Sequence, residues 1–243
     1  MSPEPSVATS SESFALAEGL RDTRTAIERW RLHPRRILVP WFAGALGVSV
    51  GLLVAVWVVS KLSIADTTPL YLAGVDSSPE PDDALPVLGR NLLVLALHAT
   101  ACVAGFIAGS SMRRVAETKT GLSRVIHEHA GPVAIAWVVA VTAFSLITQS
   151  LALGFDATTM AEQMDVSSGV LILTVLPHAL IELTAIFLPL AAWLIASRRD
   201  EWGDLLAATF VTVAIALPML LLAVTIQLLL WPRLLEAVSP VVA

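Results

Sequence analysis

The stretch LPHALIELTAI, residues 176–186, lies in the middle of a long apolar run and holds a proline, a histidine and a glutamate within six positions. The run from about Ser168 to Ser197 is long enough to cross a hydrocarbon core of about 30 Å, which takes roughly 20 helical residues. A charge at that depth costs about 2.5–3.5 kcal/mol on insertion scales. The sequence therefore predicts a membrane-spanning helix in which Glu182 faces other helices rather than lipid.

The composition of the whole chain supports a membrane protein. The 243 residues are 56% hydrophobic and 14% charged, and their mean hydropathy is +0.77. Soluble domains usually carry about a quarter charged residues. The net charge of −5 and the lack of a basic stripe with interleaved aromatic residues exclude nucleic acid as a partner. The single cysteine, Cys102, lies inside an apolar segment and leaves no intrachain disulfide to form.

Five segments are apolar and long enough to cross the bilayer as helices. They cover approximately residues 39–59, 85–110, 131–154, 168–197 and 205–231. We expect an all-α polytopic membrane protein in which residues 37–243 form this five-helix transmembrane domain. Residues 1–36 are expected to form a cytoplasmic tail and a juxtamembrane amphipathic helix.

The segment before the first span divides into two parts. Residues 1–11 are rich in Ser and Pro, lack the pattern of a signal peptide and predict a disordered tail. Residues 11–32 predict a helix that carries a sparse apolar stripe with several arginines around it. That helix either lies on anionic lipid headgroups or is an ordinary solvated juxtamembrane helix.

Basic residues predict the orientation, because connections rich in Lys and Arg stay cytoplasmic. Twelve of the 15 Lys and Arg residues fall in the N-terminal segment, the second-to-third connection and the fourth-to-fifth connection. They are Arg21, Arg24, Arg29, Arg31, Arg35, Arg36, Arg113, Arg114, Lys119, Arg124, Arg198 and Arg199. The opposite side is acidic and keeps only Lys61, Arg90 and Arg233. The N-terminus is therefore expected in the cytoplasm and the C-terminus outside.

Polar and small side chains recur along one face of the fourth span. His178 lies one helical turn from Glu182 and on the same side of the helix. The face consists of Thr174, His178, Glu182, Ala185, Pro189 and Ala192. Pro177 removes a backbone hydrogen bond, which predicts a kink beside His178.

Three other spans carry matching faces. The second span aligns Asn91, Leu95, His98, Cys102, Gly105 and Gly109, with Arg90 near its outer end. The third aligns Thr142, Ser145, Gln149 and Ala152, and the first offers the small residues Ala43, Gly47, Gly51 and Ala55 for helix packing. We expect an intramembrane polar centre made of His178, Glu182, His98, Asn91, Arg90 and Gln149. Such a centre serves either plain structural pairing or a functional site.

A short motif in the fourth span gives a family resemblance. The sequence PHALIEL, residues 177–183, resembles the Pro-His-Gly-x-x-Glu-Leu signature in a late span of the stage II sporulation protein M family, and residues 89–109 are similar to an earlier family span. The matching residues are Pro177, His178, Glu182, Leu183 and Asn91. Ala179 replaces the usual Gly, and Arg90 stands where a second Asn is common. The resemblance implies a bacterial multi-pass protein of the cell membrane that acts in a multiprotein complex.

The expected function is that of a non-enzymatic membrane scaffold or complex component, without a cofactor or a bound metal. Its expected partners are the lipid bilayer and other membrane or envelope proteins, among them a second copy in a homodimer. A small-solute or proton-coupled transporter component is the alternative, because carriers use ionisable residues and broken helices near the membrane midplane. A metal-dependent hydrolase is less supported, because His98, His178 and Glu182 offer three ligands but the chain has no His-Glu-x-x-His motif.

Overall fold

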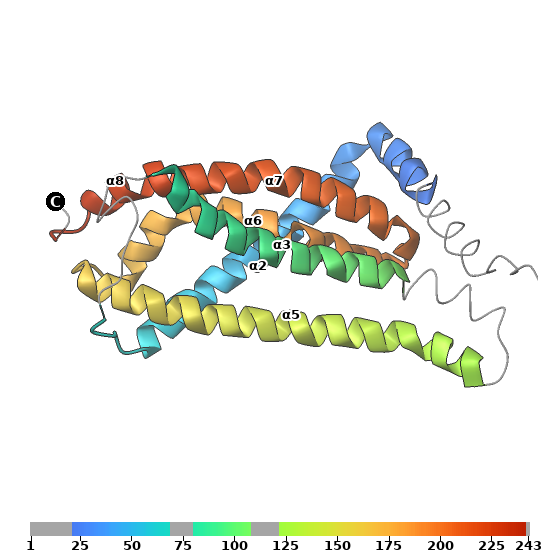
Figure 1. Ribbon diagram of the computed structural model, residues 1–243, viewed down its shortest axis with the longest axis horizontal. Helices are drawn as coiled ribbons and strands as arrows, with labels where there is room; N and C mark the ends of the chain where they lie inside the picture. Colours follow the sequence, from blue (N-terminus) through green and yellow to red (C-terminus); the bar gives the residue numbers. More distant parts are fainter. Residues whose placement is uncertain (1–20, 69–79, 108–121, 242–243) are drawn as a thin grey trace, which may run out of the picture.

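The computed structural model describes residues 21–68, 80–107 and 122–241, and within these ranges the chain is helical with no strand. Five helices are long and apolar enough to cross a membrane. They are α2 (Pro34–Leu62), α3 (Pro81–Phe106), α5 (Leu122–Gln163), α6 (Ser168–Arg199) and α7 (Leu205–Leu229). Figure 1 shows them gathered into an elongated bundle. The predicted all-α class with five candidate membrane helices is confirmed.

Several sequence-based predictions fall outside the described ranges. The disordered tail predicted for residues 1–11 is one, and most of the basic second-to-third connection is another. Gly109, at the end of the predicted face of the second span, also lies there.

Local signals in the sequence start and stop these helices. Pro34 stands at the beginning of α2, where a missing backbone N–H removes no helical bond. A capping box begins α3, with the Glu80 N–H donating to Asp83 Oδ2 at 2.8 Å. Ser167 Oγ accepts from the Val170 N–H at the start of α6. Asp200, in the left-handed conformation with φ of 58°, ends α6.

Two predicted spans differ from the observed helices. The third, predicted over residues 131–154, is part of a continuous helix of 42 residues, because the polar residues beyond the apolar run remain helical. The fifth, predicted to end at Trp231, stops at Leu229, since Trp231 and Pro232 begin the short helix α8 (Trp231–Glu236). The apolar run in the sequence therefore does not predict the full length of the helix that contains it.

Helix α6 lies in the middle of the bundle, between α7 and α5 in the view of Figure 1, and packs against α2, α3 and α7. Phe187 and Leu188 at its centre have no exposed surface. The small residues Ala185 and Ala192 are also fully buried, as expected where neighbouring backbones approach closely. Most of the face predicted for the fourth span is thus buried, but residues 183–193 are buried on every side of the helix and Glu182 is half-buried.

Glycines mark the tightest helix contacts. A Cβ atom added at Gly105 of α3 would lie 2.6 Å from Trp193 Nε1 of α6. One added at Gly154 of α5 would lie 2.5 Å from Val59 Cγ1 and 3.0 Å from the Val56 carbonyl oxygen of α2. Close approach of these backbones therefore requires that both positions lack a side chain.

The small-residue face predicted to pack in the first span is wrong in register. A Cβ atom added at Gly47 or Gly51 would meet nothing within 4 Å. The buried residues of α2 are instead Trp41, Ala45, Ser49, Leu52, Val56 and Ser60. This face mixes large and small side chains, and the close glycine contacts of α2 come instead from Gly44 against Ala191 and from Gly154 of α5.

Hydrogen bonds tie the end of α5 to the end of α2. Thr158 Oγ1 donates to the Ser60 carbonyl at 2.8 Å. Gln163 Nε2 donates to the Thr68 carbonyl, just beyond α2, at 2.7 Å. These bonds satisfy carbonyl groups at a helix end, which otherwise lack partners within the helix.

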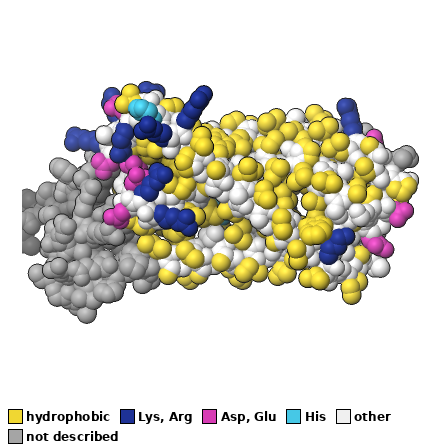
Figure 2. Space-filling view, turned by 180° about the vertical axis from the view of Figure 1, so that it is seen from behind, with side chains coloured by type: hydrophobic (Ala, Val, Ile, Leu, Met, Phe, Trp, Pro, Cys, Tyr) yellow, Lys and Arg dark blue, Asp and Glu magenta, His cyan; other side chains and the backbone are white. Residues whose placement is uncertain are grey.

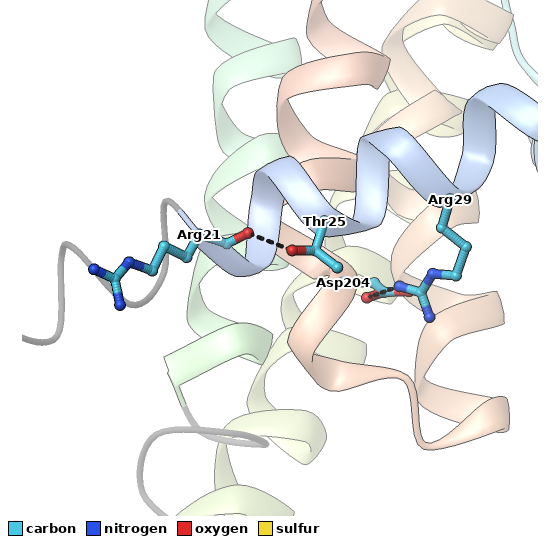
Figure 3. A network of polar contacts seen from close by, with 4 residues as sticks. All are labelled: Arg21, Thr25, Arg29 and Asp204. Atoms are coloured by element: carbon cyan, nitrogen blue, oxygen red, sulfur yellow. Dashed lines mark hydrogen bonds and ion pairs between the residues drawn. The ribbon is translucent and has the colours of Figure 1, made fainter.

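The helix over residues 21–32 packs against one end of the bundle. Arg29 Nη2 donates to both carboxylate oxygens of Asp204, at 2.8 and 2.9 Å, and Figure 3 shows the guanidinium reaching from this helix toward the turn before α7. Trp30 meets Trp41 of α2 edge to face, with 5.3 Å between ring centroids. Ala26 is fully buried. This helix is thus attached to the protein by charged and apolar contacts together.

Figure 2 shows how charge is distributed along the molecule. Lys and Arg side chains gather at the end where residues 21–36 lie, and hydrophobic side chains cover the middle of the visible face. Acidic side chains are prominent at the opposite end. An apolar belt between two charged ends is the surface expected of a bundle that crosses a bilayer.

Glycine-to-alanine substitutions at Gly154 and at Gly47 test the close contact at Gly154. We expect Gly154→Ala to lower the free energy of unfolding by about 1–3 kcal/mol, because the new methyl group overlaps Val59. Gly47→Ala should leave stability unchanged or raise it by up to about 1 kcal/mol, since the space is open and Ala favours helix. Thermal unfolding in detergent measures both, and equal midpoints for the two variants would contradict the packing described here.

Candidate functional site

All five long helices contribute to a cavity of about 240 Å³. Its polar lining residues are Arg90 of α3, Asp156 of α5, His178 and Glu182 of α6, and Gln227 of α7. Its apolar lining residues are Leu53, Val56, Leu153, Ala157, Met160, Leu171, Ile172, Val175, Ala179 and Leu183. A largely apolar pocket with a few convergent polar groups is the usual form of a binding site.

Glu182 is half-buried in this cavity. Its carboxyl group interacts electrostatically with Arg90 and comes close to the side-chain amide of Asn91. No direct ion pair joins Arg90 to Glu182, since the ion pairs within the described part of the chain are Arg24–Glu28 and Arg29–Asp204. The two opposite charges therefore face one cavity from different helices without touching.

His178 is held in place by the C-terminal end of the chain. Its ring meets Trp231 at an angle, with 6.0 Å between ring centroids. Trp231 Nε1 in turn donates to Thr174 Oγ1, one turn before His178, at 3.2 Å. Only 6% of His178 is exposed, and its Nδ1 atom has no hydrogen-bond partner among the described residues. A buried polar atom without a partner is costly and points to an interaction with a guest molecule or water.

Asn91 lies beside the same carboxyl group on α3. Its side chain is 3% exposed, and its Nδ2 atom also lacks a direct hydrogen bond to any group that the structure describes. Its nearest acceptor is therefore the Glu182 carboxyl group, and His178 Nδ1 is the unpartnered atom at the wall of the cavity.

The structure brings together four of the six residues predicted for the polar centre, namely Arg90, Asn91, His178 and Glu182. It places Gln149 elsewhere, with its Nε2 donating to Ser145 Oγ at 2.8 Å along α5. Helix α6 continues through Pro177 and Pro189, so the kink predicted at Pro177 does not interrupt it.

His98 lies apart from this cavity. Its Nδ1 atom contacts the Val94 carbonyl at 3.0 Å, and its ring packs edge to face on Phe187 with 5.4 Å between ring centroids. It lines a separate hollow of about 210 Å³ between α3 and α5. Its neighbour Phe187 lies five residues beyond Glu182, more than one helical turn further along α6.

Sequence reasoning missed Asp156 and Gln227. Asp156 was assigned to an outer connection because the third span was ended at Gly154, whereas α5 continues to Gln163. Gln227 is a single amide in the most apolar of the long helices. The signal that identified Glu182, a polar side chain within an apolar helix, applies equally to Gln227.

The three residues considered as metal ligands do not form one set. Within the ranges that the structure describes, no three His, Cys, Asp or Glu residues are grouped closely enough to hold a metal ion. Cys102 is buried, and its thiol donates to the Pro189 carbonyl at 3.1 Å, which is a packing contact between α3 and α6.

Comparisons of the chain with protein-family models, with curated proteins and with solved structures find no match. The functional argument therefore depends on the bundle and its polar cavity.

Two substitutions of Glu182 separate polar pairing from simple packing. Glu182→Gln keeps a hydrogen-bond donor and acceptor beside Asn91, so we expect it to fold normally. Glu182→Leu leaves Asn91 and Arg90 facing an apolar group and should lower stability by about 1–2 kcal/mol, or several degrees in the thermal midpoint. Unfolding in mild detergent measures the difference, and a Leu variant as stable as wild type would show that Glu182 supports no polar centre.

Proposed function

We propose that this protein is a non-enzymatic integral membrane component that assembles with other membrane or envelope proteins, as its resemblance to the stage II sporulation protein M family implies. The observation that carries this proposal is the attachment of the helix over residues 21–32 to the end of the bundle. The Arg29–Asp204 pair and the Trp30–Trp41 contact fix this helix against α2 and the start of α7. We call this fixed helix, together with residues 33–36 and 198–204, the basic platform.

The basic platform has the properties of a docking surface. An isolated exposed ion pair contributes little stability, but two hydrogen bonds from one guanidinium in combination with a buried aromatic contact hold a helix in one position. A surface ordered in advance loses less conformational entropy when a partner binds. Exposed arginines on and beside it favour an acidic partner surface. They are Arg21, Arg24, Arg31, Arg35, Arg36, Arg198 and Arg199.

We place the platform in the cytoplasm and the protein in the bacterial cell membrane. The excess of basic residues at this end supports that orientation. An odd number of spans would leave the C-terminus outside. The N-terminal helix and the α6–α7 turn lie at the same end of the bundle, as this orientation requires.

A small-solute or proton-coupled transport component is the second candidate. The cavity favours it, because ionisable residues within membrane helices often mark transport pathways and here come from α3, α5 and α6. The two candidates differ in what the purified protein does alone, since a carrier moves solute in vesicles without partners.

A charge exchange tests the platform. We expect Arg29→Asp or Asp204→Arg alone to release the N-terminal helix and to reduce the proteins that copurify after crosslinking in native membranes. The double exchange should restore them, because it reverses the pair without removing it. Arg233→Asp is the control, since it makes the same charge change on an exposed arginine of α8, at the opposite end of the bundle.

Other results would contradict the scaffold proposal. Copurification that is unchanged in both single variants would show that partners do not use the platform. Solute uptake by vesicles that hold only this protein, with no copurifying partner, would favour the transport component instead.

The proposed orientation has its own test. In a Cys102→Ala background, single cysteines at Glu162 and Glu201 lie at opposite ends of the bundle. An impermeant thiol reagent on intact cells should label position 162 and should label position 201 only after permeabilisation. Labelling in the reverse order would overturn the orientation.

A further inference from the structure

The cavity at Glu182 combines charges of both signs that do not neutralise each other directly. Arg90 supplies a guanidinium, while Asp156 and Glu182 supply carboxyl groups from two other helices. Arg90 and Glu182 influence each other across the cavity but form no direct ion pair among the described residues. Glu182 is half-buried while Arg90 and Asp156 are exposed at the rim, so a group placed between them can meet charges of both signs.

The same cavity presents a hydrogen-bonding atom that the described part of the protein leaves without a partner. His178 lines it and is 94% buried, with Nδ1 free of any hydrogen bond from the described residues. An apolar guest would leave this atom unsatisfied, which argues against a purely apolar ligand.

The arrangement of charges further restricts the class of ligand that fits the cavity. A simple anion would meet the two carboxyl groups, and a simple cation would meet Arg90. A metal ion lacks a set of three His, Cys, Asp or Glu ligands within the described ranges. A molecule with a positive and a negative group matches all three charges at once.

We propose that this cavity binds a zwitterion that carries a primary ammonium group and a phosphate or carboxylate group. The ammonium donates hydrogen bonds to Glu182, Asp156 and the neutral ring of His178. The anionic group accepts from Arg90. Two sources share this chemistry, the headgroup of an aminophospholipid and a free small zwitterion.

The remaining walls fit a small amphiphile. The other ten lining residues are apolar, and four of them, Leu53, Val56, Leu153 and Leu183, come from three different helices. The volume of about 240 Å³ is below the range of about 300–1,000 Å³ typical of drug-sized ligands, so it suits a headgroup or a molecule of similar size. A lipid would leave its chains along the apolar surface of the bundle.

Ligand-dependent thermal stability of the full purified chain in detergent tests the proposal. The probes are dihexanoyl phosphatidylethanolamine, the matching phosphatidylcholine and phosphatidylglycerol, and free glycerophosphoethanolamine. We expect phosphatidylethanolamine to raise the unfolding midpoint by about 3–6 °C at ten times its dissociation constant. Phosphatidylcholine, whose quaternary ammonium has no N–H, and phosphatidylglycerol, which has no cation, should give no shift.

Matched variants assign the shift to the cavity. Asp156→Asn and Glu182→Gln should each weaken binding at least about tenfold, because each removes an acceptor for the ammonium group. Asp66→Asn makes the same chemical change outside the cavity and should bind like wild type. Asp156 is exposed at the rim, so its variant remains informative if Glu182→Gln fails to fold.

Each outcome of this experiment either identifies the source of the ligand or overturns the proposal. A shift with glycerophosphoethanolamine as well as with phosphatidylethanolamine identifies a site for the free zwitterion, and a shift with the lipid alone identifies a lipid site. Equal shifts with all three lipids, no shift with any probe, or unchanged binding by Asp156→Asn would overturn the proposal. None of these results bears on the basic platform, which is tested separately by copurification.

Discussion

Helix α6 has to accommodate three other helices around it while it carries a glutamate and a histidine at membrane depth. Lipid offers no hydrogen bonds, so every polar group in this region must find a partner within the protein, in a guest molecule or in water. Small residues such as Ala185 and Ala192 allow the neighbouring backbones to come close. The polar residues then lie on the same face, where α3 and α5 can reach them.

The register between α3 and α6 follows from this constraint. The two helices run in the same direction, and their contacts occur in the same order along both helices. They are Asn91 with Glu182, His98 with Phe187, Cys102 with Pro189, and Gly105 with Trp193. A shift of α3 by one turn would bring Ala101 in place of Gly105 against Trp193 and move Asn91 away from the carboxyl group. Packing and polar pairing thus select the same alignment, which is the consistency expected of a well-specified fold.

The sequence alone predicted the five long helices well, because hydropathy is a property of single segments. It predicted the alignment of helices with one another less well, and residues 183–193 of α6 are buried on every side rather than on one face. His98 and Glu182 each lie near the middle of a predicted span, yet His98 lies beside Phe187, five residues beyond Glu182. Asp156 was separated from the site because the apolar run ends before the helix does. The alignment of one helix along another depends on contacts between segments, so no pattern within a single segment predicts it.

The length of α5 gives the molecule a rigid projection. The apolar run predicted from the sequence begins at Gly131, so the nine residues from Leu122 extend about 13 Å further as helix. Its tight contacts with α2, at Gly154 and Thr158, lie near the other end. Ile135, Val138 and Leu146 pack against the core between these two ends, so a tilt of α5 would move all of these contacts together. A change beside Asp156, at the wall of the cavity, would therefore be transmitted along α5 to the opposite end of the bundle.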